Sequence, residues 1–229
     1  MSLPANAFEL HCHTSEVSSC GKDPAEAVVR RCVELGYAGM VVTDHISRDR
    51  AVRKGIADLP WPEQVQHWLR GYYAAKAAAP VGFHVFPGAE FTLEESDNDY
   101  LVYGMEEDFL LHHEGIDTLA LPEFSKTIRA AGLLLAQAHP FRTDMRIVKP
   151  NLLDGMEVYN GNANHESCNG IAAQWAQRWA LLPLSGSDYH GGDSGAGRAP
   201  GGVVFRRPVQ TPGALLAALR AGEYSLLKE

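Results

Sequence analysis

Histidine and carboxylate side chains occur in small groups along this sequence, and both kinds of group bind divalent metals. Seven candidate ligands are His11, His13, His45, Glu90, His139, Asp188 and His190. This mixture of nitrogen and oxygen donors suits Zn, Mn or Fe ions. A carboxylate such as Glu90 can bridge two ions, and two ions roughly 3.5–4 Å apart would activate water and clamp a phosphoryl group. These residue types therefore predict a divalent-metal hydrolase.

Most of these candidates fall at or just after segments that have the apolar pattern of buried strands. Such segments are residues 8–13, 38–43, 83–86, 133–138 and 181–185. The His-x-His pair ends the first segment, Glu90 follows the third, and His139 follows the fourth. Alternate side chains of a strand share a face, so His11 and His13 point the same way and Cys12 points toward the core.

Helical patterns alternate with these strand patterns along the whole chain, in about seven βα repeats. One long helix is expected over residues 61–79, and residues 100–104 are expected to pair with the preceding strand after the acidic turn 94–99. The alternation predicts an α/β fold with a parallel sheet and outer helices, and the number of repeats favours a closed or nearly closed barrel. The carboxyl ends of parallel strands share one rim of such a barrel. We therefore expect the candidate ligands to converge on one mouth of a single domain over residues 1–229.

The composition excludes several other classes of protein. The chain has 229 residues, of which 45% are hydrophobic and 21% charged, and a formal net charge of -8. Such a charge argues against non-specific binding of nucleic acid or anionic membranes, which needs clustered cations. Four cysteines without a Cys-x-x-Cys pair favour neither a zinc ribbon nor a disulfide framework. The sequence shows no signal-peptide pattern and no apolar run of about 18 residues, so a cytoplasmic location is expected.

Six short motifs resemble those of the PHP (polymerase and histidinol phosphatase) superfamily and occur in the same order. They lie at residues 9–14, 43–45, 88–90, 138–140, 157–160 and 186–190. The chain is most similar to the small stand-alone phosphoesterases of that superfamily. The resemblance implies a distorted (β/α)7 TIM-like barrel with two or three divalent metal ions. It also implies that a metal-bound hydroxide hydrolyses a phosphate ester.

The same resemblance implies how the ligands would be shared among the ions. The first ion would be bound by His11, His13, Glu90 and Asp188. The second would be bound by Glu90 and His139, and the third by His45 and His190.

Two positions depart from the family pattern and affect the second and third ions. Cys20 stands where the family commonly has Asp, and Glu16 is a candidate replacement. Tyr100 stands at the position expected for a further histidine, and neutral Tyr is a poor ligand. His112 and His113 could compensate, although they fall in a predicted loop. The number of bound ions is therefore open between one, two and three.

Several other residues near the predicted mouth have two interpretations. Arg142 suits bidentate binding of a phosphate or a surface ion pair with Asp144. Asp44 would hydrogen-bond and orient a ligand histidine or act as a proton carrier, and we favour orientation. Glu157 would orient a histidine as well. Arg198, in the Gly-rich segment 191–202, would close over a substrate or be solvated. His67, His84 and His165 are expected to be structural or exposed.

Three functional hypotheses follow from these residues. The first is a metal-dependent phosphoesterase that acts on a small phosphorylated metabolite or nucleotide, without stable nucleic-acid or membrane binding. The second is an amidohydrolase-type hydrolase, because a water-activating metal site does not select phosphorus over carbon. The third is a non-catalytic metal-binding domain, which the departures at Cys20 and Tyr100 suggest. The sequence leaves the oligomeric state open.

Overall fold

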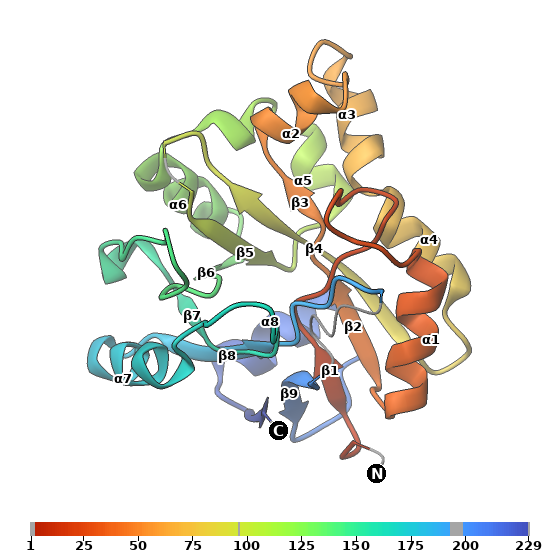
Figure 1. Cartoon of the computed structure of the whole chain (residues 1–229), viewed down its shortest axis with the longest axis vertical. Coiled ribbons are helices and arrows are strands. Elements are labelled where there is room, and N and C mark those ends of the chain that lie inside the picture. The colour runs from red at the N-terminus through yellow and green to blue at the C-terminus, as the bar shows by residue number, and fades with distance from the viewer. Residues whose placement is uncertain (1–2, 96, 193–198, 229) are drawn as a thin grey trace.

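The computed structural model describes residues 3–95, 97–192 and 199–228, and these residues form a mixed sheet curled into a nearly closed barrel (Figure 1). The strands are β1 (Ala7–Glu9), β2 (Gly39–Val42), β3 (His45–Ile46), β4 (His84–Thr92), β5 (Asp99–Tyr103), β6 (Leu134–Gln137), β7 (Gly155–Asn160), β8 (Leu182–Gly186), β9 (Gly201–Phe205) and β10 (Tyr224–Lys228). The helices are α1 (Ala25–Leu35), α2 (Arg48–Arg53), α3 (Trp61–Trp68), α4 (Arg70–Ala78), α5 (Glu107–Leu111), η1 (Ile116–Thr118), α6 (Leu121–Ala130), η2 (Pro150–Leu152), α7 (Asn169–Trp179) and α8 (Pro212–Arg220).

The strands follow the order β10-β9-β1-β2-β4-β5-β6-β7-β8, and β3 extends the sheet beside β4. Hydrogen bonds across the remaining gap bring the two ends of this order together. The Ser185 hydroxyl in β8 donates to the Leu227 carbonyl in β10 at 2.6 Å and accepts from the amide of Gly202 in β9 at 3.0 Å. At the rim, the Asp188 amide donates to the His11 carbonyl at 2.8 Å. The predicted α/β barrel is therefore confirmed.

The direction of two strands, β5 and β9, differs from the predicted parallel sheet. β5 is antiparallel to both β4 and β6, and β9 is antiparallel to β1 and β10. Only residues 93–98 join β4 to β5, and a parallel return would need a crossover of a dozen or more residues. β4 also runs on to Thr92, so the prediction that Glu90 follows this strand was wrong. Glu90 lies inside β4, opposite Leu101.

The long helix predicted over residues 61–79 is two helices, α3 and α4, that meet at Leu69. The first turn of α4 packs closely against Asp44 and Thr14 at Gly71. A Cβ atom on Gly71 would lie 2.1 Å from Asp44 Oδ2 and 2.2 Å from Thr14 Oγ1. Only glycine lets α4 pack this closely against Asp44, which adjoins the ligand candidate His45.

The barrel interior is filled below the rim by a hydrophobic cluster. Phe8 stacks on Phe86 with ring centroids 5.7 Å apart and meets Phe205 edge-on at 5.5 Å. Leu215 and Leu219 of α8 are fully buried in the same cluster, so this helix closes the amino end of the barrel. The chemistry-bearing side chains therefore rest on a solid floor. Among the described residues, none of the helices is long and apolar enough to cross a membrane.

Candidate metal centre

The structure brings all seven candidate ligands together at the carboxyl-end rim. Glu90 lies at the centre of the group, and its two oxygens face different histidines. Its Oε1 lies 3.3 Å from His11 Nε2 and 3.1 Å from His139 Nε2. Its Oε2 lies 3.3 Å from His13 Nε2 and 3.2 Å from His45 Nδ1. One carboxylate thus stands between two pairs of nitrogen donors, which is the arrangement of a bridging ligand.

Asp188 occupies the other side of the same group. Its Oδ1 lies 3.4 Å from His11 Nε2, 3.3 Å from His13 Nε2 and 3.4 Å from His190 Nδ1. Within the described part of the chain, three sets of donors lie close enough to hold one ion each, with their ligand atoms within 4.8 Å of one another. They are His11, His13 and Asp188; His11, Glu90 and His139; and His13, His45 and His190. The first set falls within the group expected for one ion, whereas the second and third each combine the residues expected for one ion with a further histidine, His11 or His13.

These donors are almost completely shielded from water. His11 and His13 are fully buried, and Glu90 and Asp188 are 1% exposed. Burial acts to raise the pKa of Glu90, but the neighbouring His11 and His45 outweigh it and hold that pKa well below its usual range. Burial likewise opposes charge on His11, yet Glu157 and Glu90 raise its pKa well above the ordinary value. The charges of the neighbouring histidines therefore favour the ionised carboxylate of Glu90, and they lower the pKa of Asp188 in the same way against the effect of burial.

Glu157 fixes the orientation of two ligand candidates from below. Its Oε1 accepts from His11 Nδ1 at 2.9 Å, and its Oε2 accepts from the His139 amide at 2.9 Å. With Nδ1 engaged in this way, His11 presents Nε2 to the ligand cluster, as in carboxylate–histidine–metal triads. The expectation that Glu157 orients a histidine is confirmed.

Two ligand candidates have backbone conformations that favour glycine. The φ angles of His139 and Asp188 are 25° and 51°. Such conformations cost on the order of 1–3 kcal/mol and collect at functional sites, where the surroundings hold them. Glu157 binds the amide of His139, and the carbonyl of His11 binds that of Asp188. The fold therefore holds both side chains in place against local strain.

Asp44 acts on the ligands through an intermediary. Its carboxylate accepts from the Thr14 amide at 2.8 Å and from the Ser18 hydroxyl at 2.6 Å. Ser18 Oγ lies 3.4 Å from His13 Nδ1 and accepts from the His45 amide at 3.1 Å. The expected direct hydrogen bond from Asp44 to a ligand histidine is thus replaced by a contact through Ser18. Asp44 braces the turn that supports His13.

At the first of the two positions that depart from the family pattern, Tyr100, the structure places a different residue near the ligand cluster. Tyr100 packs in the outer hydrophobic core, whereas the preceding Asp99 faces the rim with its Oδ2 3.8 Å from His139 Nε2. Burial and the charge of Glu90 raise the pKa of Asp99 to about 7. Tyr100 does not face the ligand cluster, because the register of the β4–β5 hairpin points Asp99 inward instead. The alternation of side chains opposite Glu90 is the signal that could have found Asp99.

Glu16 does not replace the missing Asp. Both of its carboxylate oxygens accept from the Ala25 amide at 3.0 Å and so cap the start of α1. Cys20 is partly exposed and contacts the imidazole of His190. His112 and His113 bind carbonyls within the α5 segment, at Asp108 and Phe109, and do not compensate. Arg198 lies outside the described residues.

Arg142 stands beside the ligand cluster and pairs with it directly. Its Nη2 donates to Asp188 Oδ2 at 2.7 Å and to Asn160 Oδ1 at 3.1 Å. The alternative ion pair with Asp144 was therefore wrong. The guanidinium thus lies at the edge of the ligand cluster.

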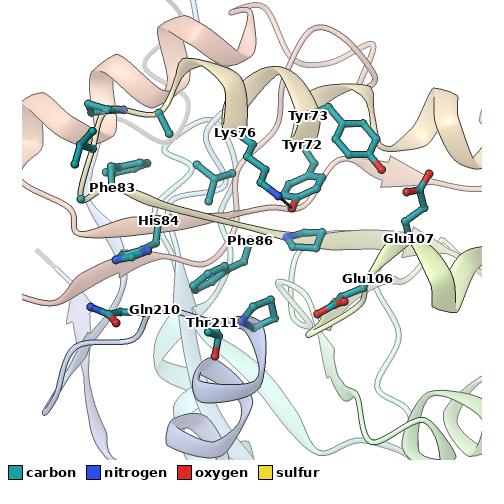
Figure 2. Close-up of a pocket in the computed structure, with 17 residues that line it drawn as sticks. Tyr72, Tyr73, Lys76, Phe83, His84, Phe86, Glu106, Glu107, Gln210 and Thr211 are labelled. Carbon is teal, nitrogen blue, oxygen red and sulfur yellow. Dashed lines mark hydrogen bonds between the residues drawn. The ribbon is translucent and has the colours of Figure 1, made fainter.

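A large pocket lies at the opposite end of β4 from Glu90 (Figure 2). It has a volume of about 690 Å³, and aromatic side chains including Tyr72, Tyr73, Phe83 and Phe86 line it with Lys76, His84, Glu106 and Glu107. Its lining includes none of the candidate metal ligands. The metal centre is instead a compact cluster of polar side chains.

A nearly closed α/β barrel with groups of histidines and carboxylates at one rim defines a barrel protein equipped to hold divalent metals. Residues 9–179 match the PHP domain family, and the chain belongs to that family. Asp188 and His190 lie beyond the matched region, yet the structure joins them to the ligands inside it. No curated protein sequence shows significant similarity to this chain.

Solved structures share the fold at low sequence identity. A two-domain protein from Bacteroides vulgatus that contains a predicted PHP-like metal-dependent phosphoesterase has a TM-score of 0.67 at 15% identity, with 96% of this chain and 64% of that chain covered. The chain thus spans just under two thirds of that protein. PsfC from Pseudomonas syringae has a TM-score of 0.65 at 15% identity, with 98% and 91% covered. The lesion-specific endonuclease EndoQ from Pyrococcus furiosus has a TM-score of 0.59 at 14% identity, with 96% and 57% covered.

Proposed function

We propose that this protein is a metal-dependent phosphoesterase that hydrolyses a phosphate ester of a small metabolite or nucleotide. The observation that carries the proposal is the position of Glu90 between two pairs of histidines, with Arg142 bound to Asp188 at the edge of the same cluster. A bridged set of cations next to a guanidinium suits a phosphoryl group, which carries negative charge on several oxygens. Family membership supports the same reaction class.

The donor set fits divalent ions on structural grounds. His45 Nδ1 is buried and lies 3.2 Å from Glu90, yet it makes no aligned hydrogen bond. Two carboxylates and five histidines in one buried cluster would be costly without a cation to satisfy them. Bound ions would supply an activated water and neutralise charge on the phosphoryl group. We assign the first position to His11, His13, Glu90 and Asp188; the second to Glu90 and His139; and the third to His45 and His190.

The remaining side chains position the ligands and the substrate. Arg142 would turn part of its hydrogen-bonding capacity from Asp188 to the substrate phosphate. Glu157 keeps His11 and His139 aimed at the cluster. Asp44 holds the Thr14–Ser18 turn and through it His13, and so we assign it an orienting role and not that of a proton carrier.

Two other substrate classes compete with a small phosphate ester. The structural similarity to a lesion-specific endonuclease makes nucleic acid one of them, in contrast to the expectation from net charge. An amide is the other, because an activated water can attack carbon as well as phosphorus. The contact of Arg142 with the ligand cluster favours an anionic phosphate over an amide.

The test measures phosphate release from a panel of monoesters after chelation and reloading with Mn²⁺ or Zn²⁺. His13→Ala should lose metal and activity together, whereas the control His112→Ala, on the exposed end of α5, should keep both. Duplex DNA and amide substrates are assayed in parallel. Equal turnover by wild type and His13→Ala would refute the proposal, and cleavage of DNA or amides alone would reassign the substrate.

A further inference from the structure

The two carboxylate oxygens of Asp188 face different kinds of partner. Its Oδ1 lies 3.3–3.4 Å from ring nitrogens of three candidate histidine ligands. Its Oδ2 accepts hydrogen bonds from Arg142 Nη2 at 2.7 Å and from the side-chain amides of Asn160 and Asn162 at 3.2 and 3.3 Å. A carboxylate oxygen has two lone pairs, so these donors fully occupy Oδ2. Asp188 therefore has Oδ1 alone to offer to a cation.

The neighbours of the two asparagines determine which end of each side chain faces Asp188. Asn162 Oδ1 accepts from the Asn164 amide at 3.1 Å, so Nδ2 is the atom directed at the carboxylate. Asn160 Oδ1 accepts from the Asn162 amide at 3.0 Å and from Arg142 Nη2 at 3.1 Å, and its Nδ2 is directed at the carboxylate in the same way. Both asparagines are buried. Their own partners thus hold both amide groups as donors to Oδ2.

Arg142 is less completely held than the asparagines. Its side chain is 13% exposed, and its Nε is buried without a hydrogen-bond partner among the described residues. This guanidinium therefore has donor capacity that its contacts with Asp188 and Asn160 leave unused. A phosphate at the edge of the ligand cluster could draw Arg142 from Asp188, whereas Asn160 and Asn162 would keep their hydrogen bonds to Oδ2.

We propose that Asn160 and Asn162 are positioning residues, which keep Asp188 a ligand through one oxygen while Arg142 binds the substrate phosphate. This inference rests on the proposed phosphoesterase function. A carboxylate whose second oxygen is free can bind a cation through both oxygens. The second oxygen would then occupy the position that a catalytic metal site keeps open for water or substrate. The two amide groups prevent this and leave Arg142 available to the phosphate.

The test measures the binding of inorganic phosphate to Mn²⁺-loaded protein by isothermal titration calorimetry. Asn162→Leu keeps the approximate size of the side chain and removes its donor, so Oδ2 depends more on Arg142. The affinity for phosphate should fall by about 10-fold or more, the usual effect of one hydrogen bond to a charged group. Metal content should equal that of wild type, because Oδ1 is unchanged. The matched control Asn164→Leu alters an exposed side chain of the same segment and should change neither value.

A second variant and a spectrum separate this role from a structural one. Asn162→Asp keeps the acceptor for the Asn164 amide but, when ionised, cannot donate to Asp188. It should weaken phosphate binding as well, without loss of metal. The visible absorption of Co²⁺-loaded protein weakens as the coordination number of the ion rises. At saturating phosphate, this absorption should be weaker in Asn162→Leu than in wild type, because Oδ2 becomes a further ligand.

Two results would overturn the role of the asparagines. One is an unchanged phosphate affinity in both variants of Asn162. The other is a parallel loss of phosphate affinity, metal content and thermal stability, which would show that Asn162 only supports the fold of the segment between β7 and α7. A wild-type protein that binds metal but neither binds phosphate nor hydrolyses any phosphate ester would instead refute the proposed phosphoesterase function, so the two failures are distinguishable.

Discussion

The two ends of the barrel differ in what they bury. At the carboxyl-end rim, imidazoles and carboxylates are packed against one another in a cluster that water hardly reaches. At the amino end, a pocket of about 690 Å³ opens between α4, the start of β4 and α8, with aromatic walls and solvated charges (Figure 2). The volume of this pocket would favour the amino end as the functional site. The buried titratable groups with perturbed pKa values favour the rim instead, because such groups are costly unless they bind a ligand or catalyse a reaction.

The largest effect expected from this contrast is that of removing the bridging carboxylate. Glu90→Gln takes a charge from between four histidines, so the variant should lose at least one equivalent of bound metal. Activity should fall by more than about 100-fold, since even residues that only orient ligands contribute 10–100-fold. Metal analysis and phosphate release measure the two effects. Glu107→Gln, at the amino-end pocket, is the matched control and should change neither.

A smaller effect is expected from the carboxylate below the cluster. Glu157→Gln removes the charge that holds His11 Nδ1 and keeps the shape of the side chain. The affinity for Zn²⁺ should fall by about 10–100-fold, the range measured for such orienting partners. Competition with a chromophoric chelator gives this affinity. An unchanged affinity in Glu157→Gln would mean that packing alone orients His11.

The sequence predicted the ligand candidates at the rim, but it did not predict the contacts of the residues around them. His11 and His13 were expected inside a strand over residues 8–13, but β1 ends at Glu9 and both lie just beyond it. Their convergence with Asp188 followed from the shared rim of parallel strands. Asp99 did not follow, because it depends on the register of an antiparallel hairpin that the connection 93–98 leaves open. The partner of Arg142 is 46 positions away in the sequence, so no local pattern could separate Asp188 from the nearby Asp144. The break between α3 and α4 likewise accompanies a tertiary contact, between Asp44 and Gly71.

Two histidines of the rim, His190 and His13, differ in their pKa values, and this difference should make metal binding depend on pH. Burial acts to lower the pKa of His190, but the contacts with Cys20 and Asp188 raise it to about 9, whereas burial lowers the pKa of His13 to about 4. At pH 7 after chelation, His190 therefore carries a proton that a cation must displace, and His13 does not. Affinity at the third position should rise with pH up to about 9, by roughly tenfold per unit for one displaced proton.

This proton release is measured by calorimetric titration with Zn²⁺ of protein whose metal has been removed by a chelator. The titration is repeated in buffers that differ in ionisation enthalpy. The slope against buffer enthalpy gives the number of protons released, which should be at least about one at pH 7. His190→Ala should release fewer protons than wild type. Zinc binding that releases no protons would contradict the charge state assigned to His190.

The smallest effect is expected at the amino end, and it tests whether the two ends are independent. Tyr73 lines the aromatic pocket, is 40% exposed and lies at the far end of β4 from Glu90. Tyr73→Phe removes a partly exposed hydroxyl and its surface hydrogen bond with Glu107, so the free energy of unfolding should change by no more than about 1 kcal/mol. Metal content and kcat/KM for phosphate esters should stay at wild-type values, because the hydrophobic floor of Phe8, Phe86 and α8 separates the pocket from the rim. A rise in KM with unchanged metal content would instead show that a substrate reaches both ends of the barrel.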